Sequence, residues 1–385
     1  MHILHVIGKL DPKLGGPIVV CRELAAGQAA RGHTVSILTS LAADGGWAVR
    51  SGVKVTVVPP VARPEQLFAV CNRGLIRKLV ERHDIAHIHG MWEGLLAQAA
   101  STSVATGKPY IHSPHGMLDE WAFSVGRTKK RVALACGFGK IPKLAGAVIV
   151  SNVHERECVE RGGYSNKVEL VPHGVNLAAL DLGKGVEQTD KPSADVAAGS
   201  PYILFLGRLH SVKGLRLLIA AFGQIAKEFS EHKLVLAGPD GGEGLPLREL
   251  AAAMGLADRV VLPGPLWGAE KARALRNAAC FCLLSEHENF GLSLAEAMAC
   301  SCPVVASQQC HFDDIATAGA GRIVERTREA AAEAMRSILK SPEAAAAMGR
   351  AGRRLVEQRF TWPAICARFE EISDRLIEAK VRSSR

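Results

Sequence analysis

Short apolar segments rich in β-branched residues alternate with segments of helical periodicity throughout the chain. In the first half the apolar segments are residues 2–8, 34–40, 53–59, 85–90, 109–116, 147–152 and 167–174. Nearly continuous apolar strands that alternate with helices are typical of parallel sheets covered on both faces. The first half is therefore predicted to form one α/β domain.

The pattern pauses at residues 181–200, which hold few bulky apolar residues and much Gly, Ser, Asp and Lys, so we expect a linker there. A second series of strands follows at residues 202–208, 233–238, 259–264, 279–284 and 302–307, with helices expected at 214–229 and 292–300. We predict two doubly wound α/β domains, 1–180 and 201–362, and an amphipathic helix, 363–385, that crosses back to the first domain. Ligands of such sheets bind at the carboxyl ends of the strands, so the domains should face each other across a cleft.

The composition is that of an ordinary globular protein. The chain has 385 residues, of which 48% are hydrophobic and 22% are charged, and this excludes a disordered or low-complexity chain. No run approaches 18 uncharged apolar residues, so no membrane-spanning helix is predicted. The first residues indicate a β-strand and not a signal peptide, and we expect a cytoplasmic protein.

The net charge of +9 is concentrated in one half of the chain. Residues 1–185 hold 22 Lys and Arg against 14 Asp and Glu, or +8, whereas residues 186–385 hold 25 against 24, or +1. The excess indicates an anionic partner for the first domain: phosphates, nucleic acid or an acidic membrane leaflet. Only 5% of the residues are aromatic and no nucleic-acid-binding signature is present, so we expect no nucleic-acid partner.

Ten cysteines are present, but none forms a CxxC pair. Cys280 and Cys282, like Cys300 and Cys302, are separated by one residue inside apolar runs. Such pairs face one side of a strand and behave as small hydrophobic residues. Neither a metal site nor a disulfide is expected.

The segment GRLHSVKGL, residues 207–215, places two cations where a strand ends and a helix begins. Arg208 and Lys213, beside the free N–H groups of a helix start, suit a diphosphate. The alternative is an ordinary solvated pair in a loop.

Two carboxylates are eight residues apart in SEHENFGLSLAEAMAC, residues 285–300. Glu288 lies in the loop before a predicted helix and Glu296 about one turn inside it. Carboxylates accept hydrogen bonds from vicinal sugar hydroxyls, and the helix start offers backbone donors. An ordinary capped helix with acidic residues near its start is the alternative.

Two further candidates follow strands of the first domain. Gly15 and Gly16, in KLGGP at 13–17, allow close approach of a ligand before a helix, although the full GxGxxG pattern is absent. His115, in HSPHGML at 112–118, can point into the cleft as a donor or acceptor. A structural histidine is the alternative at that position.

Taken in chain order, Gly15-Gly16, His115, Gly207-Arg208 with Lys213, and Glu288-x7-Glu296 followed by AMACSCPVVAS resemble the retaining glycosyltransferases of family 4. The resemblance spans essentially the whole chain. It implies the GT-B fold, with two Rossmann-like domains: an N-terminal acceptor domain and a C-terminal nucleotide-sugar domain. It also implies transfer of a hexosyl group from a nucleotide-diphosphate sugar to a glycan or lipid-linked acceptor, as in bacterial surface polysaccharide biosynthesis.

The resemblance also implies a role for each matching residue. Arg208 and Lys213 would hold the diphosphate, Glu288 would face the hexose, Glu296 the ribose, and His115 the transferred hexose. Gly16 would let the first loop approach the donor, and Leu266 falls where backbone atoms recognise the base. The implied catalytic residues are Arg208, Lys213, Glu288 and His115; the implied donor-binding residues are Gly15, Gly16, Gly207, Leu266, Asn289, Phe290, Gly291, Leu292 and Glu296.

No Asp-x-Asp sequence is present, and the resemblance implies neither a metal nor a cofactor beyond the sugar nucleotide. The basic segment 127–143, with six cations near Trp121 and Phe123, could contact an anionic membrane and present a lipid-linked acceptor; a solvated helix face is the alternative. Two other functions stay open: a sugar-nucleotide epimerase of the same fold and a non-catalytic sugar-nucleotide-binding protein. A phosphorylase is disfavoured by the length of the chain.

Overall fold

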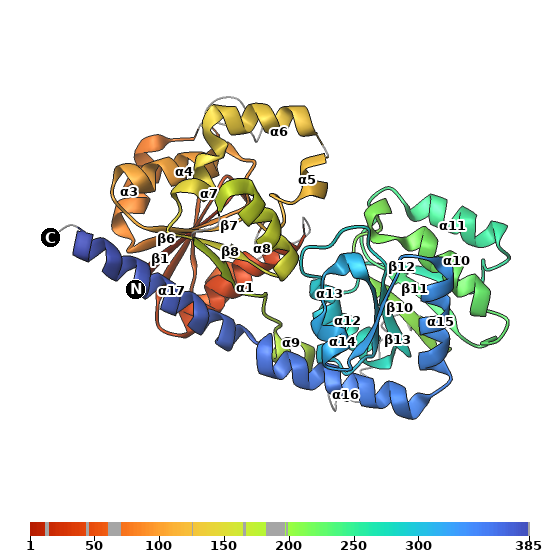
Figure 1. Ribbon diagram of the computed structural model, residues 1–385. Coiled ribbons are helices and arrows are strands. Elements are labelled where there is room, and N and C mark those ends of the chain that lie inside the picture. Colours follow the sequence, from red (N-terminus) through yellow and green to blue (C-terminus); the bar gives the residue numbers. More distant parts are fainter. Residues whose placement is uncertain are drawn as a thin grey trace. The chain divides into compact units, whose positions relative to one another are not determined.

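The computed structural model describes residues 1–11, 15–43, 46–60, 71–124, 126–164, 167–181, 197 and 199–383. The chain forms two compact units (Figure 1). Unit 1 comprises Met1–Gly174 and Trp362–Arg385, and unit 2 comprises Val175–Thr361. Each unit is an α/β structure built on a parallel sheet, as predicted.

Unit 1 contains a seven-stranded sheet in the order β5-β3-β1-β6-β7-β8-β9, and every pair in it is parallel. All seven predicted strands are present: β1 (His2–Ile7), β3 (Thr34–Thr39), β5 (Lys54–Val57), β6 (Ile85–His89), β7 (Tyr110–Ser113), β8 (Ala147–Val150) and β9 (Val168–Leu170). A separate pair, β2 (Lys9–Leu10) and β4 (Leu41–Ala42), was not predicted because each strand has only two residues.

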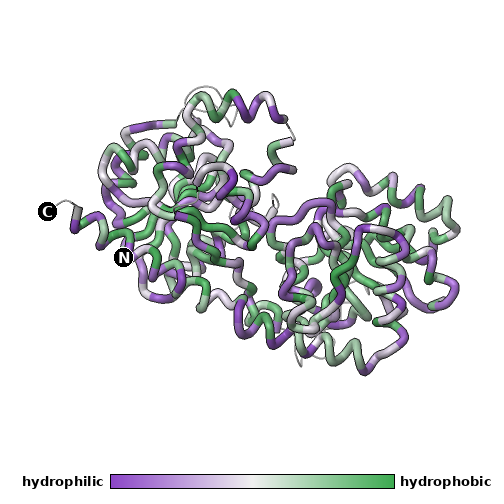
Figure 2. The backbone as a smooth tube through the Cα atoms, viewed as in Figure 1, coloured by the Kyte–Doolittle hydropathy of each residue, from purple (hydrophilic) through white to green (hydrophobic). Residues whose placement is uncertain are grey.

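The two faces of this sheet bury different residues of the same strands. Leu4 and Val6 pack in one apolar cluster, whereas Ile7 packs in another with Ile37. Successive strand residues point to opposite faces, and both faces are therefore apolar. Figure 2 shows the hydrophobic residues concentrated along the strands. His5 points to the same face as Ile7.

Helices cover this sheet, and most of them connect consecutive strands. They are α1 (Gly16–Ala30), α2 (Trp47–Ser51), α3 (Arg73–Arg82), α4 (Gly94–Ala105), α5 (Glu120–Ser124), α6 (Arg127–Ala133), η3 (Leu134–Phe138), α7 (Lys140–Leu144), α8 (Val153–Val159), η4 (Glu160–Tyr164) and α17 (Trp362–Ser383).

The C-terminal helix α17 packs against α1 of unit 1. A side chain at Gly27 would meet Cys366 Sγ at 2.6 Å, so glycine permits the close approach of the two helices. Arg31 donates to both carboxylate oxygens of Glu370 at 2.6 and 2.7 Å, and His33 Nε2 lies 3.0 Å from the same carboxylate. These contacts hold the end of the chain on the first unit, and the Arg31 hydrogen bonds lower the pKa of Glu370.

Unit 2 contains a six-stranded parallel sheet in the order β12-β11-β10-β13-β14-β15. Five strands are at the predicted positions: β10 (Tyr202–Leu206), β11 (Lys233–Ala237), β12 (Val260–Gly264), β13 (Cys280–Leu283) and β14 (Val304–Ser307). The sixth, β15 (Gly321–Val324), was missed because it is short and carries Arg322 among its four residues. Cys280 and Cys282 are buried on β13, as expected of small hydrophobic residues.

The helices of unit 2 are α9 (Leu177–Asp181), η6 (Ser211–Lys213), α10 (Leu215–Ile225), α11 (Gly244–Ala253), α12 (Gly268–Asn277), α13 (Leu292–Ala299), η7 (Gln308–Cys310), α14 (Asp314–Thr317), α15 (Arg328–Leu339) and α16 (Pro342–Arg359). The two predicted helices correspond to α10 and α13. Within the described part of the chain, no helix combines the length and the apolar character that a membrane crossing requires.

The boundary between the units differs from the prediction. Residues 175–180, which we assigned to the first domain, and Asp181, which we assigned to the linker, belong to unit 2. Val175 N–H donates to Phe360 O at 2.7 Å, Val175 and Leu180 are buried in the unit 2 core, and Asp181 pairs with Arg353 at 2.9 Å. Trp362, assigned to the second domain, lies in unit 1 against Gly174.

Candidate functional site

The loop after β10 carries the first predicted cation of unit 2. Gly207 N–H donates to Ala237 O at 3.0 Å, and a side chain at Gly238 would lie 1.8 Å from Gly207 O. The loops after β10 and β11 therefore lie in direct contact. Arg208 is exposed, and its aliphatic stem passes beside Gly241, where a Cβ would be 3.0 Å from Arg208 Cγ. The packed loops thus present Arg208 at the carboxyl end of the sheet.

The same loop continues into η6, and a glycine joins η6 to α10. Gly214 has a φ of +67° and caps the start of α10. A Cβ at Gly214 would lie 2.0 Å from Leu284 O, so the backbone there passes directly over the end of β13. Glu286 N–H donates to Val212 O at 2.7 Å. A backbone hydrogen bond and a close packing contact therefore join the loop after β10 to the loop after β13.

This contact brings together two of the predicted site residues, which are 75 positions apart. Lys213 Nζ lies 2.5 Å from Glu288 Oε2, and the two side chains are only 22% and 17% exposed. Ser285 Oγ donates to the same carboxylate oxygen at 3.4 Å. A cation and a carboxylate are thus held side by side at the carboxyl end of the sheet, where they can bind a phosphate and a hydroxyl group respectively.

The turn before α13 is shaped by Phe290 and Gly291. The ring of Phe290 is buried against Phe312 and Phe360, with ring centroids 5.1 and 5.7 Å away. Gly291 has a φ of +69°. The side chain of Phe290 therefore anchors the loop in the core and is not itself a candidate ligand contact, whereas the backbone N–H groups of a helix start are.

Glu296, the second carboxylate of the motif, lies on α13 and has a partner that we did not predict. Its Oε1 lies 2.7 Å from Lys271 Nζ on α12, and each side chain is 22% exposed. Leu266, half-buried against the core, precedes the same helix α12. The spacing of Lys271 within an amphipathic helix carries no signal that separates it from solvated lysines.

In unit 1, His115 follows β7 in an unusual backbone conformation. Its φ is +52°, a region that few residues other than glycine adopt, and Gly116 follows at +75°. The buried Glu155 carboxylate accepts the Gly116 N–H at 2.5 Å with one oxygen, and the Ser151 N–H and Oγ at 2.7 and 2.9 Å with the other. Burial raises the pKa of Glu155. Glu155, which the sequence analysis missed, therefore holds the turn in place.

His115 lines a small pocket within unit 1, together with Val20, Ser151, Glu155 and His173. The rings of His115 and His173 are 5.6 Å apart. Burial lowers the pKa of His173 to about 4 and that of His115 well below the usual 6.5. Both rings are consequently neutral at neutral pH, and they can exchange hydrogen bonds with a polar ligand without adding charge.

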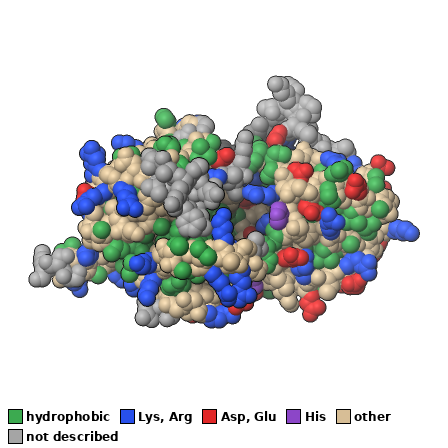
Figure 3. Space-filling model, turned by 90° about the horizontal axis from the view of Figure 1, so that it is seen from above, with side chains coloured by type: hydrophobic (Ala, Val, Ile, Leu, Met, Phe, Trp, Pro, Cys, Tyr) green, Lys and Arg blue, Asp and Glu red, His purple; other side chains and the backbone are tan. Residues whose placement is uncertain are grey.

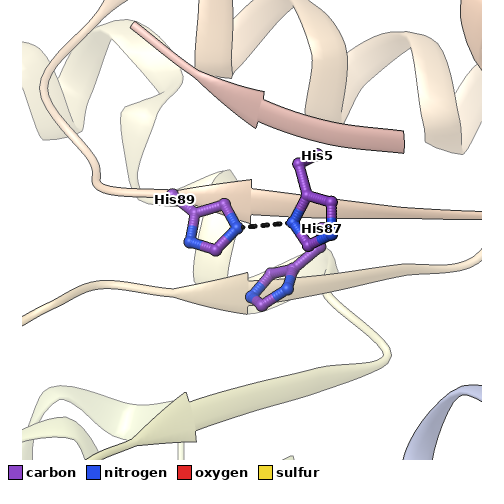
Figure 4. Close-up of side chains that lie close together, drawn as sticks. All are labelled: His5, His87 and His89. Atoms are coloured by element: carbon purple, nitrogen blue, oxygen red, sulfur yellow. Dashed lines mark hydrogen bonds between the residues drawn. The ribbon is translucent and has the colours of Figure 1, made fainter. Parts of the chain in front are cut away.

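His87 and His89 also line this pocket, and with His5 they form a cluster of three buried histidines (Figure 4). His5 on β1 is in register with His87 on β6, and His89 is two residues further along the same strand face. One ring nitrogen from each lies within 4.8 Å of the others, and this is the group that could hold a metal ion among the described residues. The period-two spacing in IAHIHG was visible in the sequence, but its register with His5 was not.

Gly15 and Gly16 lie at the start of α1. Gly15 has a φ of +124° and caps the helix, so this position favours glycine. The preceding residues 12–14 of the predicted loop lie outside the described residues. The structure therefore groups the predicted site residues into Lys213 with Glu288, Glu296 with Lys271, and His115 with the buried histidines.

Two family models match the chain. One, described as "Glycosyl transferases group 1", matches residues 186–355, and the other, "Glycosyl transferase 4-like domain", matches residues 15–174. A D-inositol 3-phosphate glycosyltransferase from Kineococcus radiotolerans is 30% identical over 322 residues, which cover 77% of this chain and 73% of the relative.

Solved structures of the same fold cover nearly the whole chain. Anabaena Alr3699/HepE in complex with UDP and glucose has a TM-score of 0.77 at 21% identity, and the match covers 98% of this chain and 100% of that one. A structure named as a putative UDP-N-acetylglucosamine 2-epimerase from Listeria monocytogenes has a TM-score of 0.64 at 14% identity, covering 96% and 94%. These likenesses support the two-unit α/β fold.

Proposed function

Because the chain belongs to the group 1 glycosyltransferases of glycosyltransferase family 4, we propose that it transfers a hexosyl group from a nucleotide-diphosphate sugar to a glycan or lipid-linked acceptor, with retention of configuration. The observation that carries the proposal is the Lys213–Glu288 pair, held by the joined loops after β10 and β13. Parallel α/β sheets bind their ligands at this end.

Arg208 and Lys213 have the charge to bind the donor diphosphate. As the glycosidic bond breaks, its electron pair moves to the phosphate oxygen, and nearby cations stabilise the negative charge that develops there. With two cations in this role, we propose that no bound metal is required. Lys213 must then turn from Glu288 toward the phosphate or bridge the two groups.

The two glutamates suit different hydroxyl groups of the donor. When Lys213 engages the phosphate, Glu288 is released to accept hydrogen bonds from the hexose, and we assign it no nucleophilic role. Glu296, fixed by Lys271, is proposed to accept from the ribose hydroxyls. Backbone atoms near Leu266 are proposed to meet the base.

Retention follows if the acceptor attacks the face that the phosphate leaves. A new bond forms between the acceptor oxygen and the anomeric carbon, and the acceptor proton passes to the leaving phosphate oxygen. His115, being neutral, is proposed to contact a hydroxyl group of the transferred hexose. The pocket beside it in unit 1 supports this role.

Two classes of acceptor fit this chain. The Kineococcus relative is named for D-inositol 3-phosphate, so a phosphorylated polyol is the second candidate beside a glycan or lipid-linked acceptor of surface polysaccharide biosynthesis. Both carry negative charge when phosphate-linked, which fits the +8 charge of residues 1–185. Mass spectrometry of the product distinguishes the two acceptors. The protein and its donor are incubated either with inositol 3-phosphate or with an undecaprenyl-diphosphate-linked sugar.

We also propose that segment 127–143 contacts the anionic inner face of the cytoplasmic membrane. Five of its six cations are exposed, and Trp121, Val132 and Leu144 nearby are 40%, 50% and 46% exposed. Figure 3 shows basic side chains standing beside apolar ones on unit 1. The sixth cation, Lys130, is partly buried over the Trp92 ring, 5.7 Å from its centroid. Exposed cations beside apolar side chains suit an interfacial contact.

Flotation with vesicles tests the membrane contact. We expect the protein to float with phosphatidylglycerol vesicles and not with phosphatidylcholine vesicles, and the K129E/R131E double variant to lose this binding. The control is K78E/R82E, which makes the same charge change at exposed positions of α3 in the same unit. If both double variants float equally, the overall charge of unit 1, and not segment 127–143, drives binding.

Donor binding is tested by thermal shift with UDP, GDP, ADP and dTDP in the presence of EDTA. A ligand that binds only the folded state raises its stability, so one diphosphate should raise the melting temperature. Lys213→Ala should abolish the shift. Arg216→Ala is the control because Arg216 is a nearby exposed cation that pairs with Glu243 instead. The absence of any shift would argue against a metal-free donor site.

A sugar-nucleotide epimerase is the second candidate, favoured by the fold shared with the Listeria structure. An epimerase needs a carboxylate that removes the proton at C2 of the sugar. Glu155 is a buried carboxylate in the His115 pocket, but both of its oxygens already accept hydrogen bonds. Incubation with UDP-N-acetylglucosamine alone distinguishes the functions, because an epimerase produces the C2 epimer and a transferase does not. A non-catalytic binding protein would bind the diphosphate without either turnover.

A further inference from the structure

A continuous chain of hydrogen bonds runs from helix α1 to His115. Gln28 Oε1 lies 2.7 Å from His5 Nε2, His5 Nδ1 lies 2.9 Å from His89 Nε2, and His89 Nδ1 lies 3.1 Å from His115 Nε2. Gln28, His5 and His89 are buried, whereas His115 is half-buried at the pocket. Four side chains from α1, β1, β6 and the loop after β7 thus form one line.

In this line of hydrogen bonds, the position of the proton on one ring determines its position on the next. A neutral imidazole has one N–H donor and one acceptor nitrogen. The Gln28 carbonyl oxygen can only accept, so His5 carries its proton on Nε2 and accepts at Nδ1. His89 must then donate from Nε2 and accept at Nδ1. His115 must donate from Nε2, which leaves its Nδ1 without a proton.

The surroundings favour the neutral form of every ring in the line. Burial is the main cause that lowers the pKa of His5 to about 4 and the pKa values of His89 and His115 well below 6.5. Among the described residues, no carboxylate is hydrogen-bonded to any of the three rings. Each ring therefore carries a single N–H. Every hydrogen bond in the line is then donated in the same direction, from His115 toward Gln28.

We propose that Gln28 is a positioning residue which, through His5 and His89, keeps Nδ1 of His115 as a hydrogen-bond acceptor. An acceptor nitrogen attracts a hydroxyl group and repels a phosphate oxygen. The inference rests on the proposed function in one respect, namely that the hydroxyl belongs to the transferred sugar. It restricts His115 to sugar recognition and leaves the diphosphate to Arg208 and Lys213.

Two neighbouring histidines lie outside this line and provide the comparison. His112 Nε2 donates to Gly90 O at 2.9 Å, and His87 Nε2 lies 2.8 Å from Ser113 Oγ while its ring packs on Phe369. Neither is joined to Gln28 through these bonds. A substitution at Gln28 should therefore leave the proton positions of His112 unchanged.

The line and a bound metal ion exclude each other. A metal held by His5, His87 and His89 needs a lone pair from each ring directed at the ion. In the line, one of the two nitrogens that face each other at 2.9 Å carries a proton. Stoichiometric zinc or another transition metal in the purified protein would overturn the proposal.

Nitrogen NMR of the full chain labelled with 15N-histidine reads the proton positions directly, because protonated and bare ring nitrogens resonate far apart. Single His→Gln variants assign the rings. We expect Nδ1 of His115 to be unprotonated in the wild type and in Gln28→Glu, whose carboxylate also only accepts. In Gln28→Met, which is similar in size and lacks the acceptor, His5, His89 and His115 should show mixed tautomers while His112 is unchanged.

Two NMR outcomes would refute the proposal: a protonated Nδ1 at His115 in the wild type, or an unaltered His115 signal in Gln28→Met. The second readout is turnover of a sugar nucleotide that carries the nucleoside diphosphate identified by thermal shift. We expect the turnover of Gln28→Glu to stay within about twofold of the wild type and that of Gln28→Met to fall about tenfold. Both variants should have the melting temperature of the wild type. The NMR result needs no sugar nucleotide, so it stands or fails independently of the proposed function.

Discussion

The Glu155 carboxylate accepts the backbone N–H of Gly116 at 2.5 Å, and this contact holds the turn that carries His115. The two residues are 39 positions apart. A backbone with positive φ at His115 is strained, and such strain persists only where the surroundings determine it. Glu155, near the start of α8, holds the strained backbone of this turn in place.

We therefore expect Glu155→Gln to destabilise unit 1. One of the donors at Gly116 and Ser151 would face an amide NH2 group and lose its acceptor, which costs about 1–3 kcal/mol for a buried donor. Urea unfolding followed by tryptophan fluorescence measures the loss. Glu157→Gln, at an exposed position of the same helix, is the control and should change little. Equal stability of both variants would contradict the role given to Glu155.

Arg208→Ala and Lys213→Ala should each lower turnover by about 10²–10³-fold, the usual effect of removing a group that stabilises transition-state charge. Arg216→Ala should keep wild-type turnover because that cation already pairs with Glu243 at 2.9 Å. The measurement is the steady-state rate with a sugar nucleotide that carries the nucleoside diphosphate identified by thermal shift. Wild-type rates in the first two variants would place the diphosphate elsewhere.

Glu296→Ala should raise the KM for the donor more than it lowers kcat, because the ribose does not react. Lys271→Ala should also raise the KM for the donor more than it lowers kcat, but by less. Lys271 holds the Glu296 carboxylate at 2.7 Å and does not contact the ligand in our proposal. Steady-state kinetics over a range of donor concentrations measures both constants. A large fall in kcat with an unchanged KM would rule out the ribose assignment.

Gly214→Ala should destabilise unit 2 more than Gly255→Ala does. The two glycines have nearly the same positive φ, +67° and +68°, so the backbone strain of alanine is matched. A Cβ at Gly214 would lie 2.0 Å from Leu284 O, whereas one at Gly255 meets nothing within 4 Å. We expect a difference in unfolding free energy of about 1–3 kcal/mol from the overlap. Similar losses in the two variants would mean that the loops separate easily.

The stability of unit 1 should fall as the pH decreases from 6.5 toward 4. Burial lowers the pKa of His5 and of His112 to about 4, so the unfolded chain takes up protons in this range and the folded unit does not. Stability is thus complete above pH 6.5, and each such histidine contributes a loss of about 1 kcal/mol per pH unit below it.

Urea unfolding at several pH values tests this dependence, and four of the five tryptophans report on unit 1. His112→Asn keeps a donor toward Gly90 O but does not titrate, and it should reduce the proton uptake on unfolding by about one. A flat profile between pH 7 and 5 would show that the buried rings are already protonated in the folded unit.

The local sequence was enough to predict most of the strands and the loops that carry the site. Twelve apolar segments became twelve strands of two parallel sheets, because a run of β-branched residues between helical segments is buried in any such packing. The eight-residue spacing of Glu288 and Glu296 likewise places one in the loop before α13 and the other inside the helix. Strand β15 was missed because four residues, one of them charged, form too short a pattern.

Which side chains meet was decided by the tertiary structure. His5 and His89 are 84 residues apart, Glu155 and Gly116 are 39 apart, and Lys271 and Glu296 are 25 apart. Periodicity reports that a position is buried, but the partner depends on the strand register and on how closely loops approach. The sequence by itself determined the two α/β units and the chemistry available at their strand ends. Packing between distant segments determined that His115 ends a line of neutral histidines and that Lys213 lies against Glu288.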